Sequence, residues 1–594
     1  MSMRKSTSIG ILLVTLFAGL AMGATADPLG KKIGDFTLRD YRGKERSLNE
    51  YQGHPVVVVF IGSDCPLAKL YAPRLEELYQ EFKEKGVGFF AINSNRQDSM
   101  AKVGSFARVH KLSYPVLKDP DNTIADAFQA QRTPHAYLLD GEGVIRYAGR
   151  IDDQYGLGAT SGYAKPELGA PFLGNAIKEL LGGKEVSLAA TEATGCIIGR
   201  VPKIKPHGDV TYSQQIARIL NKRCVSCHRT GEIAPFPLTS YAEVNGWGEM
   251  MLEVIEKGQM PPWFANPEYG KFKNDCRMSK EEIALVKTWV ANGSPEGDPA
   301  NLPEPPDYIV GWQIPTPDEI HYMSEEPYDV PAEGVVEYKY MTADPGWTED
   351  KWIKAAQARP DNREVVHHII VYAVPPDSKR APTRHKSVAG FAPGSPARIY
   401  LNGVANFVPA GSKLVFQMHY TPNGSPQKDR SSVGFVFADE KDVERAAGGG
   451  LAGFWRFAIP PNDANHKIVG EKEFKKDVFL VDMLPHMHLR GKSFRYTAVY
   501  PDGAEEILLD VPRYDFNWQL RYELTEPKLM PKGTKLRVTG YYDNSNGNLA
   551  NPDPSATVRY GDQTWEEMFH GFYGTMPVDK RKQTKPEAKR KQAE

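Results

Sequence analysis

Cysteine is scarce in this chain of 594 residues. The five cysteines are Cys65, Cys196, Cys224, Cys227 and Cys276, and none occurs after residue 276. So few thiols exclude a fold held together by a network of disulfides. The second half of the chain must instead be stabilised by the packing of its own core.

An excess of charge of one sign is also lacking. Lys and Arg number 73 and Asp and Glu number 74, so the formal net charge is −1. This balance gives no global attraction to nucleic acid or to an anionic membrane, and we expect no nucleic-acid partner.

Long apolar runs are missing except at the N-terminus. Arg4 and Lys5 precede an apolar run at residues 9–22, and Ala24-Thr25-Ala26 follows. This pattern predicts a signal peptide, residues 1–26, cleaved after Ala26. A membrane anchor is the alternative, but the run is shorter than the ~20 residues that span a bilayer. We therefore expect a periplasmic or secreted chain with no integral membrane segment after cleavage.

The chain is too long for one hydrophobic core, and its patterns predict several domains. In residues 27–190 strands and helices alternate: VVVVFIG (56–62) reads as a buried strand, and the next strand is VGFFAINSN (87–95). Such alternation predicts an α/β domain. Residues 191–206 are a linker. Residues 207–300 are helical, with a capping box at residues 279–282.

The rest of the chain reads as β-structure. A proline-rich connector, residues 301–325, precedes short alternating segments such as VVHHIIVYAV (365–374) and LVFQMHY (414–420). These predict two all-β sandwich domains, residues 326–455 and 456–578. Residues 579–594 form a Lys-rich tail that we expect to be disordered.

The motif CVSCH, Cys224 to His228, predicts a covalently bound c-type haem. Cys224 and Cys227 have the spacing that reaches the two vinyl groups of a haem, and His228 would then bind the iron. A thioredoxin-type thiol pair or half of a zinc site is the alternative. We predict Met260, in GQMPPW, as the sixth ligand, with Met250, Met251 and Met278 as competitors. The stretch resembles a small all-α cytochrome c-like domain.

Histidines gather in the cysteine-free region. His367 and His368 are adjacent, His419 lies in LVFQMHY, and His486 and His488 lie two apart in LPHMHLR. Residues two apart share one face of a strand, which suits two imidazoles on one metal. Thioether sulfur favours copper, and Met568 follows downstream; structural zinc would bring thiolates or carboxylates. The sequence therefore favours copper.

These residues carry a family resemblance. The His367-His368 pair, His419 in a Q-x-H-Y segment, the H-x-H pair and Met568 after Glu567 occur in the order found in copper type II, ascorbate-dependent monooxygenases. This is the family of peptidylglycine hydroxylating monooxygenase and dopamine β-monooxygenase. The resemblance implies two jelly-roll-like domains facing across a solvent-filled cleft, with one copper in each.

The resemblance also implies the ligand sets. One copper would be held by His367, His368 and His419, and the other by His486, His488 and Met568, with His570 as a competitor for Met568. Adjacent residues of a regular strand face opposite ways, so His367 and His368 require a bulge or twist to share one copper. The animal enzymes are disulfide-rich and this region is not. Arg490, Tyr541, Tyr542 and Tyr560 are candidate cleft residues.

The sequence around Cys65 indicates a third redox site. It lies in FIGSDCPLAKLY between a strand and a helix, where a helix N-terminus lowers a thiol pKa. With Thr133-Pro134 at the place of a cis-proline, residues 27–190 resemble the redoxin and alkyl hydroperoxide reductase-like branch of thioredoxin folds. Ala68 stands where a C-x-x-C motif has its second cysteine, and Gly62 stands where peroxiredoxins have an activating Thr. Cys196 or Cys276 could resolve Cys65 or pair with each other.

Together these patterns predict a multidomain oxidoreductase with two coppers and one haem. The leading prediction is a monooxygenase that hydroxylates a C–H bond of an unidentified small-molecule or peptide substrate with O2. The haem would relay electrons from a separate donor. The first alternative is a periplasmic electron-transfer, thiol-redox or copper-binding protein without oxygenase activity. The second makes the thiol domain the enzyme.

Overall fold

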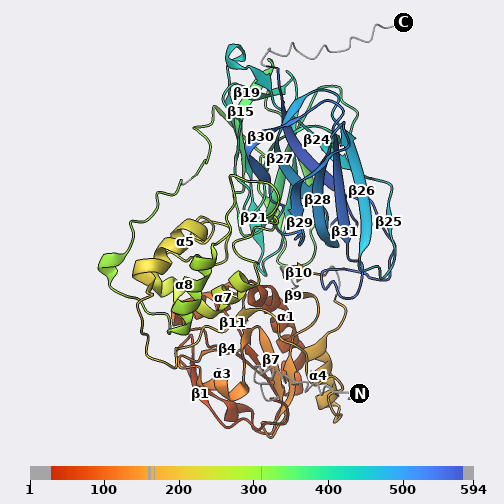
Figure 1. The fold of residues 1–594 in the computed structure, drawn as a ribbon. Helices are drawn as coiled ribbons and strands as arrows, with labels where there is room; N and C mark the ends of the chain where they lie inside the picture. Colours follow the sequence, from red (N-terminus) through yellow and green to blue (C-terminus); the bar gives the residue numbers. More distant parts are fainter. Residues whose placement is uncertain (1–27, 158–161, 166–167, 310, 580–594) are drawn as a thin grey trace, which may run out of the picture.

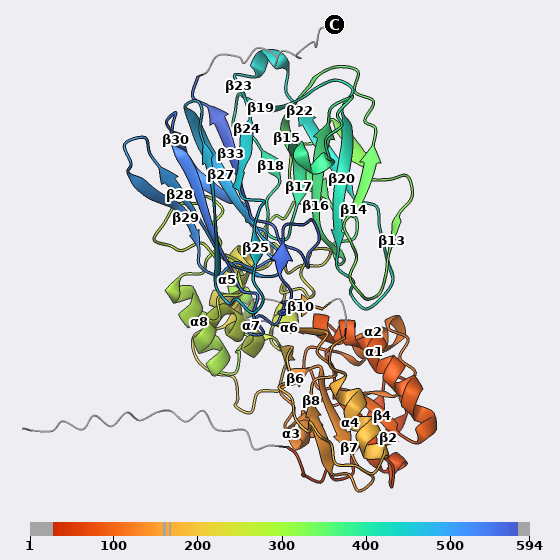
Figure 2. The same ribbon diagram turned by 90° about the vertical axis from the view of Figure 1, so that its right-hand side faces the viewer.

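The computed structural model describes residues 28–157, 162–165, 168–309 and 311–579. The predicted signal peptide and all but the first residue of the predicted tail lie outside these ranges. An α/β domain forms one end of the molecule, a group of helices lies in the middle, and β-sheets form the other end (Figures 1 and 2). None of the helices in the described ranges combines the length and apolar character needed to cross a membrane.

The α/β domain has a seven-stranded sheet of order β2-β1-β5-β4-β3-β7-β8, in which β3, β4 and β5 are parallel. The strands are β1 (Thr37–Asp40), β2 (Glu45–Ser47), β3 (Val56–Phe60), β4 (Gly88–Asn93), β5 (Val116–Lys118), β7 (His135–Leu139) and β8 (Ile145–Gly149). The helices are α1 (Pro66–Phe82), α2 (Met100–Val109), α3 (Thr123–Phe128) and α4 (Phe172–Leu181). Four short strands complete it: β6 (Arg132–Thr133), β9 (Tyr155–Leu157), β10 (Gly162–Ala164) and β11 (Cys196–Ile197).

Helices cover both faces of this sheet. Val57 and Val59 of β3 pack in one core with α1, α2 and α4, while Val56, Val58 and Phe60 pack in another with α3. A strand buried on both faces needs apolar side chains at every position, which explains the unbroken VVVVF run. The predicted α/β domain is confirmed.

The helical unit contains α5 (Ala217–Arg223), α6 (Tyr241–Val244), α7 (Gly248–Glu256) and α8 (Lys280–Ala291), with a π-helical turn at Tyr212–Ile216. The predicted capping box is present: Ser279 accepts from the amide of Glu282, whose side chain accepts from the amide of Ser279. Gly293, at φ 77°, follows the end of α8. The helical prediction is confirmed, and the resemblance of this unit to cytochrome c stays a prediction.

Two pairs of sheets form the β-rich region. The first pair consists of β12-β22-β15-β19-β23, with β18 beside β15, and β14-β20-β16-β17. Its strands are β12 (Glu319–Tyr322), β14 (Lys339–Ala343), β15 (Lys351–Arg359), β16 (Val366–Val374), β17 (Ser387–Phe391), β18 (Arg398–Ile399), β19 (Val404–Val408), β20 (Lys413–Tyr420), β22 (Ser432–Phe437) and β23 (Arg445–Ala446), with β13 (Tyr328–Val330) and β21 (Gln427–Asp429) paired separately.

The second pair consists of β24-β33-β27-β30 and β26-β31-β28-β29. Its strands are β24 (Gly448–Gly453), β26 (His466–Glu473), β27 (Val478–His486), β28 (Gly491–Val499), β29 (Glu505–Val511), β30 (Tyr522–Met530), β31 (Lys535–Tyr542) and β33 (His570–Pro577), with β25 (Ala458–Ile459) and β32 (Val558–Arg559) paired separately.

Each pair of sheets encloses its own core. The predicted β-rich region is therefore confirmed, while its jelly-roll-like character stays a prediction. Besides β11, which lies in the predicted linker 191–206, two elements of the β-rich region fall outside their predicted ranges. β12 lies inside the predicted connector, residues 301–325. It was not predicted because it has only four residues and prolines surround it. β24 pairs with β33 of the second sandwich although it precedes residue 456. Its sequence GGGLAG looks like a turn rather than a strand.

Candidate functional site

The thiol site lies where α1 begins. Cys65 is the N-cap residue of α1 and is completely buried. Its sulfur lies 3.0 Å from the backbone oxygen of Thr133, and the Thr133–Pro134 peptide is cis, as expected at this position.

Cys196 lies beside Cys65. It belongs to β11, which pairs antiparallel with β6 so that Cys196 is opposite Thr133. The thiol of Cys196 donates a hydrogen bond to the sulfur of Cys65. Burial raises the pKa of Cys65, but the hydrogen bonds that its sulfur receives from Cys196, Thr133 and Ala68 together outweigh burial and lower that pKa to about 6. The bond to Cys65 and burial raise the pKa of Cys196. Of the two partners left open by the sequence, the structure places Cys196 at Cys65.

Gly195 makes this arrangement possible. A Cβ atom at residue 195 would lie 2.1 Å from the backbone oxygen of Thr133. The linker can therefore approach β6 only if residue 195 has no side chain. Gly62 is equally crowded: a Cβ there would lie 2.6 Å from the amide nitrogen of the Asn95 side chain and 3.2 Å from Cβ of Cys65. The site has no room for the threonine of peroxiredoxins.

The predicted haem-attachment cysteines follow α5. Burial raises the pKa of Cys224 to about 12 and raises that of Cys227 as well. His228 is held by its Nδ1, which lies 3.1 Å from the backbone oxygen of Phe236. This bond fixes the tautomer in which Nδ1 carries the proton and Nε2 is the atom that could bind iron. The residues thus fit the haem that the motif implies.

Met260 follows α7 in a loop and is half-buried. Its competitors have other contacts. The sulfur of Met250 accepts the amide of Ile197 at 3.4 Å, Met251 is buried in the core, and Met278 packs against the same core. Met260 therefore stays the predicted sixth ligand, since its thioether is not part of that core.

His367, His368 and His419 form a compact group. Their candidate ligand atoms lie within 4.8 Å of one another. Nδ1 of His368 is 3.4 Å from Nδ1 of His367 and 3.4 Å from Nδ1 of His419. Ligands at 2.0–2.1 Å from one tetrahedral metal ion are separated by roughly 3.3 Å, so this spacing is that of a metal site. Burial lowers the pKa of His367 to about 4 and holds those of His368 and His419 well below the usual value, so all three rings are neutral near pH 7 and can offer a lone pair.

A bulge brings the adjacent pair together. The register of β16 against β20 shifts between Val366 and His368, so that His367 has no partner of its own in the ladder. The predicted departure from regular strand geometry is confirmed, and it allows both rings to approach His419.

The second histidine group lies at the end of β27. The rings of His486 and His488 are 5.2 Å apart, although β27 ends at His486. Nδ1 of His486 lies 2.9 Å from the side-chain oxygen of Gln519, and Nδ1 of His488 lies 3.2 Å from the backbone oxygen of Glu566. Both contacts direct the proton to Nδ1 and leave Nε2 as the candidate ligand atom.

Glu567 holds this turn in place. Its two oxygens accept the amides of His488 at 2.8 Å and Arg490 at 2.7 Å, and burial raises its pKa to about 8. The adjacent Met568 is buried, and its backbone oxygen accepts from the Tyr542 hydroxyl at 2.7 Å. The competitor His570 is opposite His486 in the ladder, and its buried Nε2 makes no hydrogen bond. Met568 and His570 both remain candidates.

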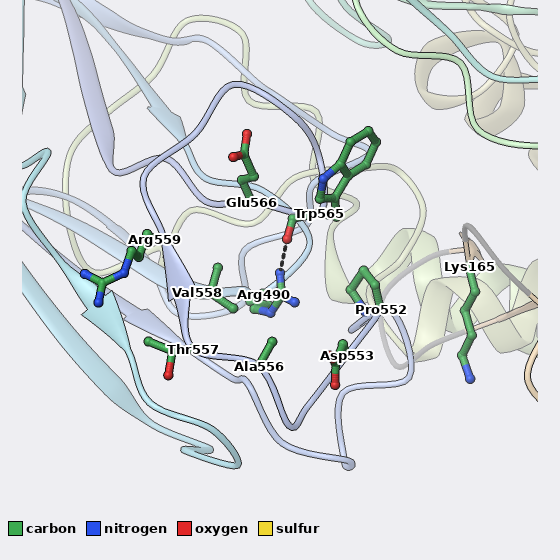
Figure 3. A pocket seen from close by; sticks show the side chains of 10 residues that line it. All are labelled: Lys165, Arg490, Pro552, Asp553, Ala556, Thr557, Val558, Arg559, Trp565 and Glu566. Carbon is green, nitrogen blue, oxygen red and sulfur yellow. Dashed lines mark hydrogen bonds between the residues drawn. The ribbon is translucent and has the colours of Figure 1, made fainter.

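A pocket of about 630 Å³ adjoins this group (Figure 3). Trp565 and Glu566 line it, and the backbone of Glu566 also contacts His488. Arg490 lines it too, but donates to the side chain of Asn544 and the backbone oxygen of Trp565, which gives it a structural role. Lys165, from the α/β domain, closes one side.

Comparisons with known proteins concern the α/β domain. Residues 29–148 match the family model described as AhpC/TSA family. A thiol-disulfide oxidoreductase ResA of Geobacillus kaustophilus is 28% identical over 132 residues, which is 22% of this chain and 75% of the relative. That of Halalkalibacterium halodurans is 32% identical over 116 residues, 20% of this chain and 65% of the relative. A solved structure, an uncharacterized conserved protein from Geobacillus kaustophilus, is 30% identical and covers 30% of this chain and 94% of its own, with a TM-score of 0.26.

The family model and the ResA relatives confirm the thioredoxin-like domain and support an oxidoreductase. Sequence reasoning missed Phe516, Gln519 and Tyr338, whose rings or amides contact the histidines. No motif indicates these three residues, because they lie in loops and strands far in sequence from the histidines that they contact. Cys196 was one of the two candidate partners of Cys65, and it is the one nearer in sequence to the α/β domain.

Proposed function

We propose that this chain carries out thiol–disulfide exchange through Cys65 and Cys196. The pairing of the two buried thiols beside the cis-proline supports this function most directly. The lowered pKa of Cys65 makes it the attacking thiolate, and the raised pKa of Cys196 keeps that residue protonated until the second step. The predicted export would place the pair in an oxidising compartment.

The reaction has two balanced steps. The Cys65 thiolate attacks one sulfur of a substrate disulfide, forms a mixed disulfide and releases the first thiolate of the substrate. Cys196 then loses its proton and attacks the sulfur of Cys65, which releases the second substrate thiolate. Two electrons pass from the protein to the substrate, and the Cys65–Cys196 disulfide remains. The substrate reaches Cys65 when β11 moves away, and only two residue pairs hold β11 to β6.

The reduced full-length chain should be mixed with oxidised glutathione to test this function. The native chain should release two glutathione thiols per Cys65, whereas Cys196→Ser should stop at a glutathione adduct on Cys65. Cys276→Ser is the matched control and should behave like the native chain. Equal products from the native chain and Cys196→Ser would rule out Cys196 as the resolving thiol.

A second candidate function is the copper-dependent hydroxylation of a substrate C–H bond with O2. The 3.4 Å spacing of three neutral imidazoles favours it. His367, His368 and His419 would hold one copper, and His486, His488 and Met568 the other; copper would supply one-electron chemistry with O2. A haem attached to Cys224 and Cys227, with His228 and Met260 as ligands, would supply electrons from an external donor. The pocket beside Glu566 would hold the substrate.

Copper content and product formation test this candidate separately. His419→Ala and His486→Ala should each lose about one copper per chain and all hydroxylated product. The exposed His207 provides the control, so His207→Ala should keep both coppers and the activity. Copper binding without oxygen consumption by any substrate tried would favour a copper-binding role instead.

A further inference from the structure

One loop of the second sandwich touches both histidine groups. This bridging loop, residues 515–519, lies between β29 and β30. The side chain of Gln519 accepts from His486 at 2.9 Å, and the ring of Phe516 stacks on His367. The backbone oxygen of Gln519 also accepts from the hydroxyl of Ser395, in the first sandwich, at 3.3 Å. The loop is therefore tied to both sandwiches.

Phe516 of this loop lies between the two groups. Its ring stacks on His367 at 5.6 Å with an interplanar angle of 18°, and it is 6.0 Å from His419. The same ring is 5.9 Å from His488 of the second group. The side chain is only 8% exposed. A single phenyl ring therefore contacts both His367 of one group and His488 of the other, where the family resemblance implies a solvent-filled cleft.

We infer that the bridging loop joins the two histidine groups into one composite two-metal centre, with Phe516 as the wall they share. Gln519 is a positioning residue, because it fixes the tautomer of His486. The inference rests on the metal binding of the second candidate function and does not require its oxygenase activity.

Two consequences follow from this geometry. The ring centres of His419 and His488 lie 6.0 and 5.9 Å from that of Phe516, so the two imidazoles cannot be farther apart than the sum of these distances. Ions bound to the two groups would therefore be close enough for their electron spins to interact. A change at one group would also reach the other, because Phe516 and Gln519 belong to the same five-residue segment of the chain.

The experiment adds Cu(II) alone to the purified full-length chain. Pulsed electron paramagnetic resonance measures the dipolar interaction between the two ions, and competition with a chelator measures their affinities. The native chain should show two ions with a strong dipolar interaction. Gln519→Leu should weaken binding at His486 by roughly 10–100-fold, and Gln519→Glu, which keeps the acceptor, should restore most of it.

Phe516→Leu removes the shared ring while it keeps an apolar side chain. It should alter the dipolar interaction and the affinity of both groups together. The exposed Gln214 provides the control: Gln214→Leu makes the same change of residue type in the helical unit and should alter neither.

Two results would overturn the inference, and only one of them would also contradict the second candidate function. Two bound ions without a dipolar interaction would contradict the composite centre alone. No bound copper in a folded chain would contradict the second candidate function as well.

Discussion

Single residues decide which chemistry the thiol domain can perform. Cys65 was found from its place before a helix, and its cis-proline neighbour from the pair Thr133-Pro134. The partner of Cys65 stayed open, because sequence spacing does not determine which distant thiol folds back. The contact depends on Gly195 and on the pairing of β11 with β6, which are properties of the folded linker.

Gly62 offers a test at this scale. Gly62→Ala should lower the free energy of unfolding by about 1–3 kcal/mol, because the new Cβ overlaps the side chain of Asn95. Gly34→Ala is the matched control, since nothing lies within 4 Å of a Cβ there and its φ is ordinary. Thermal unfolding of both variants checks this. A Gly62 variant as stable as the control would show that the site has room for a side chain.

Gly195 governs the approach of the two thiols. Gly195→Ala should push β11 away from Thr133 and slow formation of the Cys65–Cys196 disulfide roughly tenfold or more, because small displacements of reacting atoms are costly. Gly183→Ala is the control. Gly183 also has a positive φ, 69° against 129° at Gly195, but nothing lies within 4 Å of a Cβ there, so this variant should not slow the reaction. Alkylation of free thiols at timed intervals measures the rates. Equal rates in the two variants would refute the steric explanation.

At the scale of elements, the pattern of apolar residues was enough to predict the strands and the helix that contribute most to the cores. β3, β16, β20 and α8 lie where their patterns predicted them. The bulge at His367 was required by the chemistry of the pair rather than by any turn residue, and the structure contains it. β12 and β24 were not predicted, because prolines surround the first and glycines make up most of the second. Pairing with distant strands makes them strands.

The capping box of α8 gives a prediction for an element. Ser279→Ala should lower the stability of the chain by about 1 kcal/mol, because the amide of Glu282 loses its acceptor. Ser105→Ala, at an exposed position inside α2, removes a hydroxyl without removing a cap and should be nearly neutral. Chemical denaturation measures both. A loss at Ser279 no larger than at Ser105 would show that this cap does not stabilise α8.

At the scale of the whole molecule, the units that carry the three predicted redox centres contact one another. The helical unit contacts the α/β domain through the ion pair of Arg132 and Glu253, and it contacts the second sandwich through Trp263, whose ring is 4.9 Å from that of Tyr522. Sequence patterns identified each centre separately. They contained nothing about the surfaces between the units, because those contacts involve residues without a motif.

Metal and haem content test this arrangement. The chain produced with its predicted signal peptide should contain about two coppers and one haem, and Cys224→Ser with Cys227→Ser should abolish the covalent haem while both coppers remain. Elemental analysis and a haem stain of the denatured chain measure the two. Haem that survives denaturation in the double variant would contradict attachment at CVSCH, and Cys276→Ser should retain the haem as a control.

The most direct test of the central claim is a map of the disulfide that forms when the folded, reduced chain is mildly oxidised. Proteolysis and mass spectrometry should recover the Cys65 and Cys196 peptides joined to each other, with the loss of two hydrogen atoms. The account predicts this linkage in the native chain and in Cys276→Ser. Recovery of Cys196 joined to Cys276, with Cys65 still free, would contradict it.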